Sequence, residues 1–130
     1  MIGDVDHVGV VVADLASARR FVAEVLGFEH RHSVEIPGRL RAEFFTKGSC
    51  ELELIEVSEP AERAARLRPG AKATLDHVAL QASDVGAAVR ALGGLGVEFD
   101  RGGMFVINGH EVAFTVAETS EGVRYQLVGP

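Results

Sequence analysis

Residues 5–15 read VDHVGVVVADL, and residues 75–85 read LDHVALQASDV. The two stretches align without a gap at an offset of 70 residues, and each carries one histidine at the same place, His7 and His77. Each pattern is typical of a β-strand that is followed by an aspartate and then by a helix. An internal repeat of this kind indicates that the chain duplicates one unit of about 60–70 residues.

The elements that follow the two histidine strands also repeat. In the first half, the strand at residues 5–13 precedes a helix that Asp14 caps and Gly27 ends. Three more strands are expected there, over residues 28–34, 40–46 and 50–57. In the second half, a strand and a helix capped by Asp84 precede several short strands. These elements are expected at residues 75–82, 85–92, 97–100, 104–107, 111–117 and 123–128.

This order predicts an α+β fold in which one domain, residues 1–130, contains two pseudo-symmetric βαβββ modules. Module one spans residues 1–57, and module two spans residues 75–130. The linker at residues 58–74 holds a short helix that begins near Pro60.

Composition limits the possible partners. The net charge of −6 argues against a nucleic acid or an anionic membrane surface as the partner, because both select a basic face. No apolar run approaches the roughly 20 residues of a membrane span, and the N-terminus lacks the features of a signal peptide. Cys50 is the single cysteine, so a cytoplasmic protein without disulfides is expected.

Four polar side chains are candidates for a metal site. Period-two alternation separates them from the apolar residues of their strands, and the pseudo-symmetry relates His7 to His77 and Glu53 to Gln126. Two imidazoles and two oxygen donors suit a divalent transition metal with open coordination positions. Two structural explanations compete with this one: the repeated histidine could reflect ancestry alone, and the Glu-rich run around Glu53 could be a solvated face.

The ordered motifs resemble the vicinal oxygen chelate superfamily over nearly the whole chain. This superfamily includes glyoxalase I, methylmalonyl-CoA epimerase, extradiol dioxygenases and bleomycin-binding proteins. The motifs are DHVGV at residues 6–10, LGF at 26–28, LEL at 52–54, DHVAL at 76–80 and EGVRYQL at 121–127. The resemblance implies a cupped, barrel-like mixed sheet around a metal, with helices outside, and a homodimer.

Within the superfamily, the chain looks most like methylmalonyl-CoA epimerase. The resemblance implies that a divalent metal (Co, Ni, Mn or Zn) is held by His7, Glu53, His77 and Gln126. It also implies an acid/base role for Glu43. The epimerases use a glutamate at the position of Gln126 as the other acid/base residue, and an amide cannot shuttle a proton. The second base is then Glu53, by the pseudo-symmetry, or Glu43 acts alone.

The expected function is that of a metal-dependent epimerase, isomerase or glyoxalase-type lyase. It would act through an enolate on a small α-oxo or acyl-thioester substrate. The alternative is a metal-free module that binds a small molecule such as an antibiotic. An extradiol-type dioxygenase ranks lower, because its carboxylate ligand belongs at Gln126. A tailoring enzyme of secondary metabolism is also compatible with the motifs.

Two further pairs of residues are notable. His30 and His32 lie two apart, which places them on one face of a strand, where they either chelate a metal or line an exposed edge. Arg39 and Arg41 either receive an anionic substrate or pair with nearby carboxylates.

Overall fold

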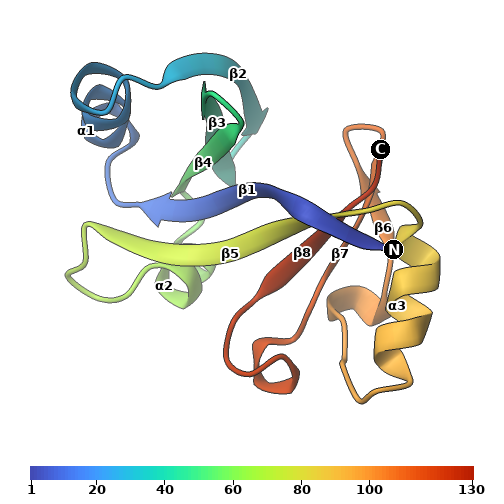
Figure 1. The fold of residues 1–130 in the computed structure, drawn as a ribbon. Coiled ribbons are helices and arrows are strands. Elements are labelled where there is room, and N and C mark those ends of the chain that lie inside the picture. Colours follow the sequence, from blue (N-terminus) through green and yellow to red (C-terminus); the bar gives the residue numbers. More distant parts are fainter. The chain divides into compact units, whose positions relative to one another are not determined.

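The computed structural model describes all 130 residues, which divide into two compact units. The first unit comprises residues 7–76, and the second comprises residues 1–6 together with 77–130. Figure 1 traces the elements of both units along the chain. The unit boundaries fall inside strands β1 (Ile2–Val12) and β5 (Ala73–Ala82), so each of these strands contributes to both units.

The strands of the first unit are neighbours in the order β2-β3-β4-β1, and we call this part of the β-structure the first sheet. Strands β2, β3 and β4 are antiparallel neighbours, whereas β4 and β1 run parallel. After β1, the elements are α1 (Leu15–Arg20), a π-helical segment (Phe21–Val25), β2 (Glu29–Ile36), β3 (Leu40–Lys47), β4 (Cys50–Val57) and α2 (Pro60–Arg66).

The second unit repeats this arrangement with the strand order β5-β8-β7-β6. Strands β5 and β8 are parallel, and β8, β7 and β6 are antiparallel. After β5, the main elements are α3 (Val85–Gly93), β6 (Phe105–Ile107), β7 (His110–Phe114) and β8 (Tyr125–Val128). Short 3₁₀ turns occupy Asp100–Gly102 and Ala117–Thr119. The predicted α+β class with two βαβββ modules is therefore confirmed.

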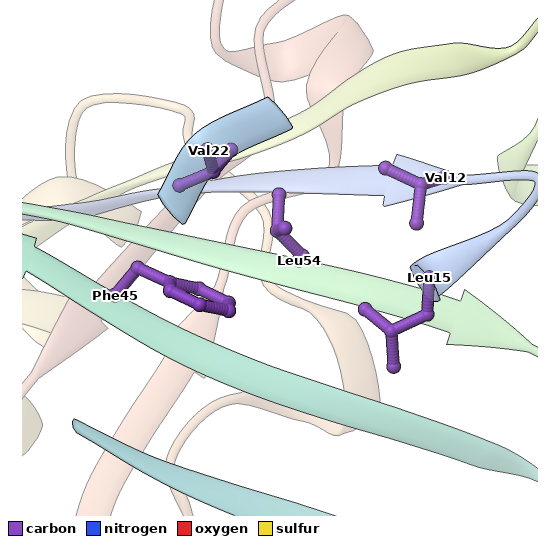
Figure 2. Close-up of a cluster of buried hydrophobic side chains, with 5 residues drawn as sticks. All are labelled: Val12, Leu15, Val22, Phe45 and Leu54. Atoms are coloured by element: carbon purple, nitrogen blue, oxygen red, sulfur yellow. The ribbon is translucent and has the colours of Figure 1, made fainter. Parts of the chain in front are cut away.

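A hydrophobic cluster joins α1 to one face of the first sheet. Its buried members come from the strands, from α1 and from the π-helical segment: Val12, Leu15, Val22, Phe45 and Leu54 (Figure 2). These side chains converge because residues two apart on a strand point to the same side. The corresponding cluster of the second unit uses smaller side chains: Ala82, Val85, Ala88, Ala113 and Leu127.

Both predicted helix caps are present. The side chain of Asp14 accepts a hydrogen bond from the Ser17 N–H, and that of Asp84 accepts one from the Ala87 N–H. After Arg20 the first helix widens into the π-helical segment, and Gly27, with a φ of +80°, ends it. A positive φ is easily adopted only by glycine, so the predicted stop at Gly27 is confirmed.

The sequence pattern overestimates the strands between α3 and β8. The strand expected at residues 97–100 is reduced to a single bridge between Phe99 and Thr115. The chain turns at once into the 3₁₀ segment Asp100–Gly102, in which Arg101 has a φ of +56°. A left-handed residue interrupts a strand, and the alternation of apolar and polar side chains in Val97, Glu98 and Phe99 does not reveal it. None of the helices has the length and apolar character needed to cross a membrane.

Candidate functional site

The first unit brings His7 and Glu53 together on one face of its sheet. Strand β1 pairs with β4 so that Gly9 lies opposite Glu53, which sets the His7 side chain beside the glutamate. The Nε2 atom of His7 lies 3.2 Å from Oε1 of Glu53, and the two side chains are only 7% and 15% exposed. Both are therefore largely shielded from water while they remain in contact with each other.

Phe44 supports this pair from the neighbouring strand. It lies opposite Glu53 in the β3–β4 ladder, and the edge of its ring system meets His7 with centroids 5.6 Å apart at 80°. This edge-to-face arrangement is one of the two that aromatic rings prefer. On its other flank, Phe44 stacks with His32 at 4.4 Å.

The second unit holds an equivalent set. Strand β5 pairs with β8 so that Ala79 lies opposite Gln126, which places His77 in the same relation to Gln126 as His7 has to Glu53. Phe114 lies opposite Gln126 and meets His77 with centroids 5.6 Å apart at 88°. Both His77 and Gln126 are buried. We call the sets His7/Glu53/Phe44 and His77/Gln126/Phe114 the first and second half-sites.

Gln126 carries a buried oxygen that lacks a hydrogen-bond partner. Its Oε1 atom is the only buried side-chain nitrogen or oxygen of the chain that has no hydrogen-bond partner. An unsatisfied buried acceptor costs about 1–3 kcal/mol, so such atoms need a reason to be retained. An amide oxygen is a metal ligand, as are imidazole nitrogens and carboxylate oxygens, so each half-site offers a pair of donors that suits a divalent metal. The residues present therefore fit the expected metal.

The strand alternation of the sequence also predicts that Glu43 shares the face of the candidate ligands, and this prediction is wrong, because Glu43 lies on the opposite side of the first sheet from Glu53. It pairs across the ladder with Leu54, a member of the cluster under α1, whereas Ala42 and Phe44 occupy the other face. The error arose because the apolar side chains of β3 are distributed over both faces: Ala42 packs with Ile55, and Phe45 packs under the helix.

The carboxylate of Glu43 is bound by a single guanidinium. Arg19 on α1 donates two hydrogen bonds to it, Nε to Oε1 at 2.7 Å and Nη2 to Oε2 at 2.8 Å. These hydrogen bonds from Arg19 hold the pKa of Glu43 below its ordinary value, against the opposing effect of burial. A carboxylate fixed in its ionised form in this way is a weak proton acceptor.

Arg66 on α2 is a residue of the site region that sequence reasoning missed. It donates two hydrogen bonds to Asp76, at 3.1 and 3.0 Å, and a third to Glu62 at 2.7 Å. Burial by itself would lower the pKa of Arg66, but the bonds and charges of Asp76 and Glu62 raise it. The residue that precedes His77 is thereby anchored to the linker helix. The only signal for this contact was an arginine near the end of a predicted helix.

The two histidines of β2 do not share a face. A bulge between His30 and His32 shifts the ladder, so that His30 lies opposite Phe45 and His32 opposite Phe44. The extra residue of a bulge reverses the alternation of side chains between the two faces of the strand, and sequence periodicity does not predict it. The arginines singled out on β3 and its turn are both paired, Arg39 with Glu62 at 2.8 Å and Arg41 with Glu35 at 3.6 Å.

A family model described as the Glyoxalase/Bleomycin resistance protein/Dioxygenase superfamily matches residues 6–114. The chain belongs to this superfamily. A curated relative, the uncharacterized protein YqjC of Bacillus subtilis (strain 168), is 30% identical over 128 residues, covering 96% of this chain and 91% of its own. The superfamily resemblance seen in the sequence is thus confirmed.

Solved structures of the superfamily share the fold at low identity. Methylmalonyl-CoA epimerase from Mycobacterium tuberculosis has a TM-score of 0.86 at 22% identity, covering 98% of this chain and 87% of that one. A variant of the Streptomyces coelicolor epimerase, in complex with 2-nitronate-propionyl-CoA, has a TM-score of 0.86 at 21% identity, covering 99% and 98%. These likenesses establish the fold of the superfamily member described here.

Proposed function

We propose that the two half-sites together hold one divalent metal through His7, Glu53, His77 and Gln126. The observation that carries this proposal is the repetition of one register in two units. In each unit a histidine and an oxygen donor lie in the same relation on neighbouring parallel strands, and each histidine meets a phenylalanine. The donor atoms include two imidazole nitrogens and a carboxylate oxygen. The unpartnered oxygen of Gln126 supplies the fourth ligand.

We propose further that the protein catalyses a proton transfer beside a carbonyl group. When bound, a divalent metal acts as a Lewis acid and lowers the cost of removing a proton from the carbon next to a carbonyl. The carboxylate that accepts the proton must lie on the face of the half-sites. Of the two glutamates on that face of β4, Glu51 is bonded to Arg31 at 2.8 Å, whereas Glu53 contacts His7. Glu53 is therefore the base.

A single base favours an isomerase or glyoxalase-type lyase over a two-base epimerase. Epimerisation by two bases requires acidic groups on both sides of the reacting carbon. Gln126 cannot accept a proton, and Glu43 is turned toward α1. Glu53 can take a proton from one carbon and return it to the neighbouring carbon on the same side. We assign Glu43 to fixing α1 on the sheet, and we expect the protein to act as a homodimer on a small α-oxo or acyl-thioester substrate.

The test is proton exchange at carbon in the metal-loaded protein. Hemithioacetal and acyl-CoA candidates are incubated in D₂O and followed by NMR, with Glu53→Gln as the variant and Glu51→Gln as its matched neighbour on the same face. We expect Glu53→Gln to slow exchange about 10²–10⁴-fold, as for loss of a general base. Glu51→Gln is expected to have little effect. Equal exchange in wild type and Glu53→Gln would refute the assignment. Light scattering of the same sample tests the dimer.

A further inference from the structure

The second unit carries a row of two arginines and two phenylalanines next to its half-site. The guanidinium of Arg124 lies over the Phe114 ring at 4.1 Å, and that of Arg101 lies over the Phe105 ring at 4.5 Å. The two rings are stacked on each other with centroids 6.0 Å apart. Phe114 is also the ring that meets His77, so the row begins at the second half-site.

A guanidinium that lies over an aromatic ring is attracted to the ring as a cation. It still carries N–H groups that can donate hydrogen bonds to an anion. Arg124 is ion-paired with Asp100, whose Oδ2 lies 3.5 Å from Nη2. The side chain of Arg101 is exposed and makes no hydrogen bond or ion pair within the chain. The Phe105 ring positions the Arg101 guanidinium, and no carboxylate neutralises its charge.

The backbone at Arg101 is arranged in an uncommon way. Arg101 has a φ of +56°, and Gly102 and Gly103 follow with +73° and +142°. A left-handed conformation at a residue with a side chain is costly and tends to occur where function requires it. Gly103 is buried against α3, where an added Cβ would lie 3.6 Å from Cγ1 of Val89. The turn is therefore packed onto the unit, and it directs Arg101 over Phe105.

The first unit has no such cationic row. Its equivalent ring, Phe44, stacks with the exposed His32 rather than with an arginine. The arginines on the strands β2 and β3 of that unit each have a carboxylate partner, Arg31 with Glu51 and Arg41 with Glu35. The unpaired arginine next to a half-site, Arg101, therefore belongs to the second unit. It is a local positive charge in a chain whose net charge is −6.

We propose that Arg101 and Arg124 bind an anionic group of the substrate, a carboxylate or a phosphate, at the end of the substrate away from the reacting carbon. This inference deepens the proposed function and rests on it. Guanidinium groups bind carboxylate and phosphate oxygens through paired charge-assisted hydrogen bonds. The substrate class is thus an anionic carbonyl compound, oriented so that its charged group lies over the second unit.

The experiment measures binding of small anions by calorimetry at low ionic strength. The probes are malonate, inorganic pyrophosphate and uncharged malonamide, and the protein is the full chain, as purified and again after dialysis against EDTA. We expect malonate or pyrophosphate to bind the wild type, and Arg101→Gln and Arg124→Gln to weaken that binding about tenfold or more. Arg90→Gln, which removes an exposed arginine of α3, is the matched control and is expected to bind as the wild type does.

A second variant separates binding from folding. Arg101→Gly suits the left-handed backbone, so its melting temperature is expected to stay close to that of the wild type while anion binding is lost. Preference for malonate identifies a carboxylate site, and preference for pyrophosphate identifies a phosphate site. Equal anion binding by wild type and Arg101→Gln, or equal binding of malonamide, overturns the inference.

The failure of this inference is distinguishable from failure of the proposed function. If proton exchange depends on metal but anion binding is unchanged in Arg101→Gln, only the proposed anion site is overturned. The anion probes can be measured after EDTA treatment, so their binding does not depend on metal. A protein that takes up no metal but binds anions through Arg101 would therefore overturn the proposed metal-dependent enzyme and leave the anion site in place.

Discussion

The two units carry the same framework and differ in the charges placed on it. Each has a histidine on the first strand, an oxygen donor on the last strand and a phenylalanine opposite that donor. The donor is the carboxylate Glu53 in the first unit and the amide Gln126 in the second. The second unit adds two arginines over its aromatic rings. We infer that the framework serves metal binding, while the differences divide proton transfer and substrate orientation between the units.

The same comparison explains Glu43. Phe44 and Phe114 are equivalent, so the residue one place earlier is Glu43 in the first unit and Ala113 in the second. Arg19 corresponds to Val89 at the repeat offset, and Val89 packs against the cluster that contains Ala113. One unit thus has an ion pair where the other has apolar packing. This equivalence supports a structural role for the Arg19–Glu43 pair.

The largest expected effect comes from exchanging the oxygen donors between the units. Glu53→Gln alone should slow carbon proton exchange about 10²–10⁴-fold, because it removes the base. Adding Gln126→Glu returns a carboxylate to the pseudo-equivalent position. We expect the double variant to keep its metal, which metal analysis of the dialysed protein checks. Proton exchange should recover by at least tenfold over Glu53→Gln, measured by NMR in D₂O.

The control for the donor exchange is Gln126→Glu alone, which retains Glu53. It is expected to exchange protons at least as fast as the wild type, because it carries both carboxylates. A double variant that binds metal but is no faster than Glu53→Gln would show that the two half-sites are not functionally equivalent.

A smaller effect is expected when the ion pair under α1 is replaced. Glu43→Ala leaves Arg19 without its partner and should lower the free energy of unfolding by about 1–3 kcal/mol. Arg19→Val with Glu43→Ala copies the apolar arrangement of the second unit. The double variant should recover most of that loss, since apolar side chains often replace an ion pair that is largely shielded from water without loss of stability. Urea denaturation measures Glu43→Ala, Arg19→Val and the double variant, and additive losses would contradict the equivalence of the two positions.

The smallest expected effect is a pH dependence of stability from the same pair. The pKa of Glu43 lies below its ordinary value of 4.5 because Arg19 hydrogen-bonds the ionised form. The stabilisation is therefore complete above pH 4.5, declines below it, and is lost once the pH has fallen through the pKa of the folded state. Wild type and Glu43→Gln should differ by about 1 kcal/mol at pH 7, and the difference should shrink as the pH falls below 4.5 and through the lowered pKa of Glu43. Urea midpoints at several pH values check this, and a constant difference would count against it.

The sequence predicted the fold where the repeat could be read and failed where local geometry intervened. The histidine strands, the caps Asp14 and Asp84, and the duplicated order of elements were all visible in residue types and their spacing. The bulge between His30 and His32 and the left-handed Arg101 reverse or interrupt the strand alternation, and no residue type signals either one.

The candidate site was partly visible in the same way. Alternation assigned the faces of His7, Glu53, His77 and Gln126, and the ladders of the structure supply the registers that set His7 beside Glu53 and His77 beside Gln126. Glu43 was placed on the wrong face, because alternation gives two faces without saying which of them the helix covers. The supporting rings Phe44 and Phe114 and the Arg101–Arg124 row depend on cross-strand register, which only the folded ladder defines.

The central claim is that the two half-sites hold a single metal, and the stoichiometry of Co²⁺ binding tests it most directly. Co²⁺ is titrated into the wild type, His7→Ala and His77→Ala, with the exposed His110→Ala as the control. We predict one Co²⁺ for each wild-type chain and for each His110→Ala chain, and loss of tight binding in either of the other two variants. Two ions per chain, with each histidine variant losing one, would contradict the claim. A wild type that binds no Co²⁺, Ni²⁺, Mn²⁺ or Zn²⁺ would also contradict it.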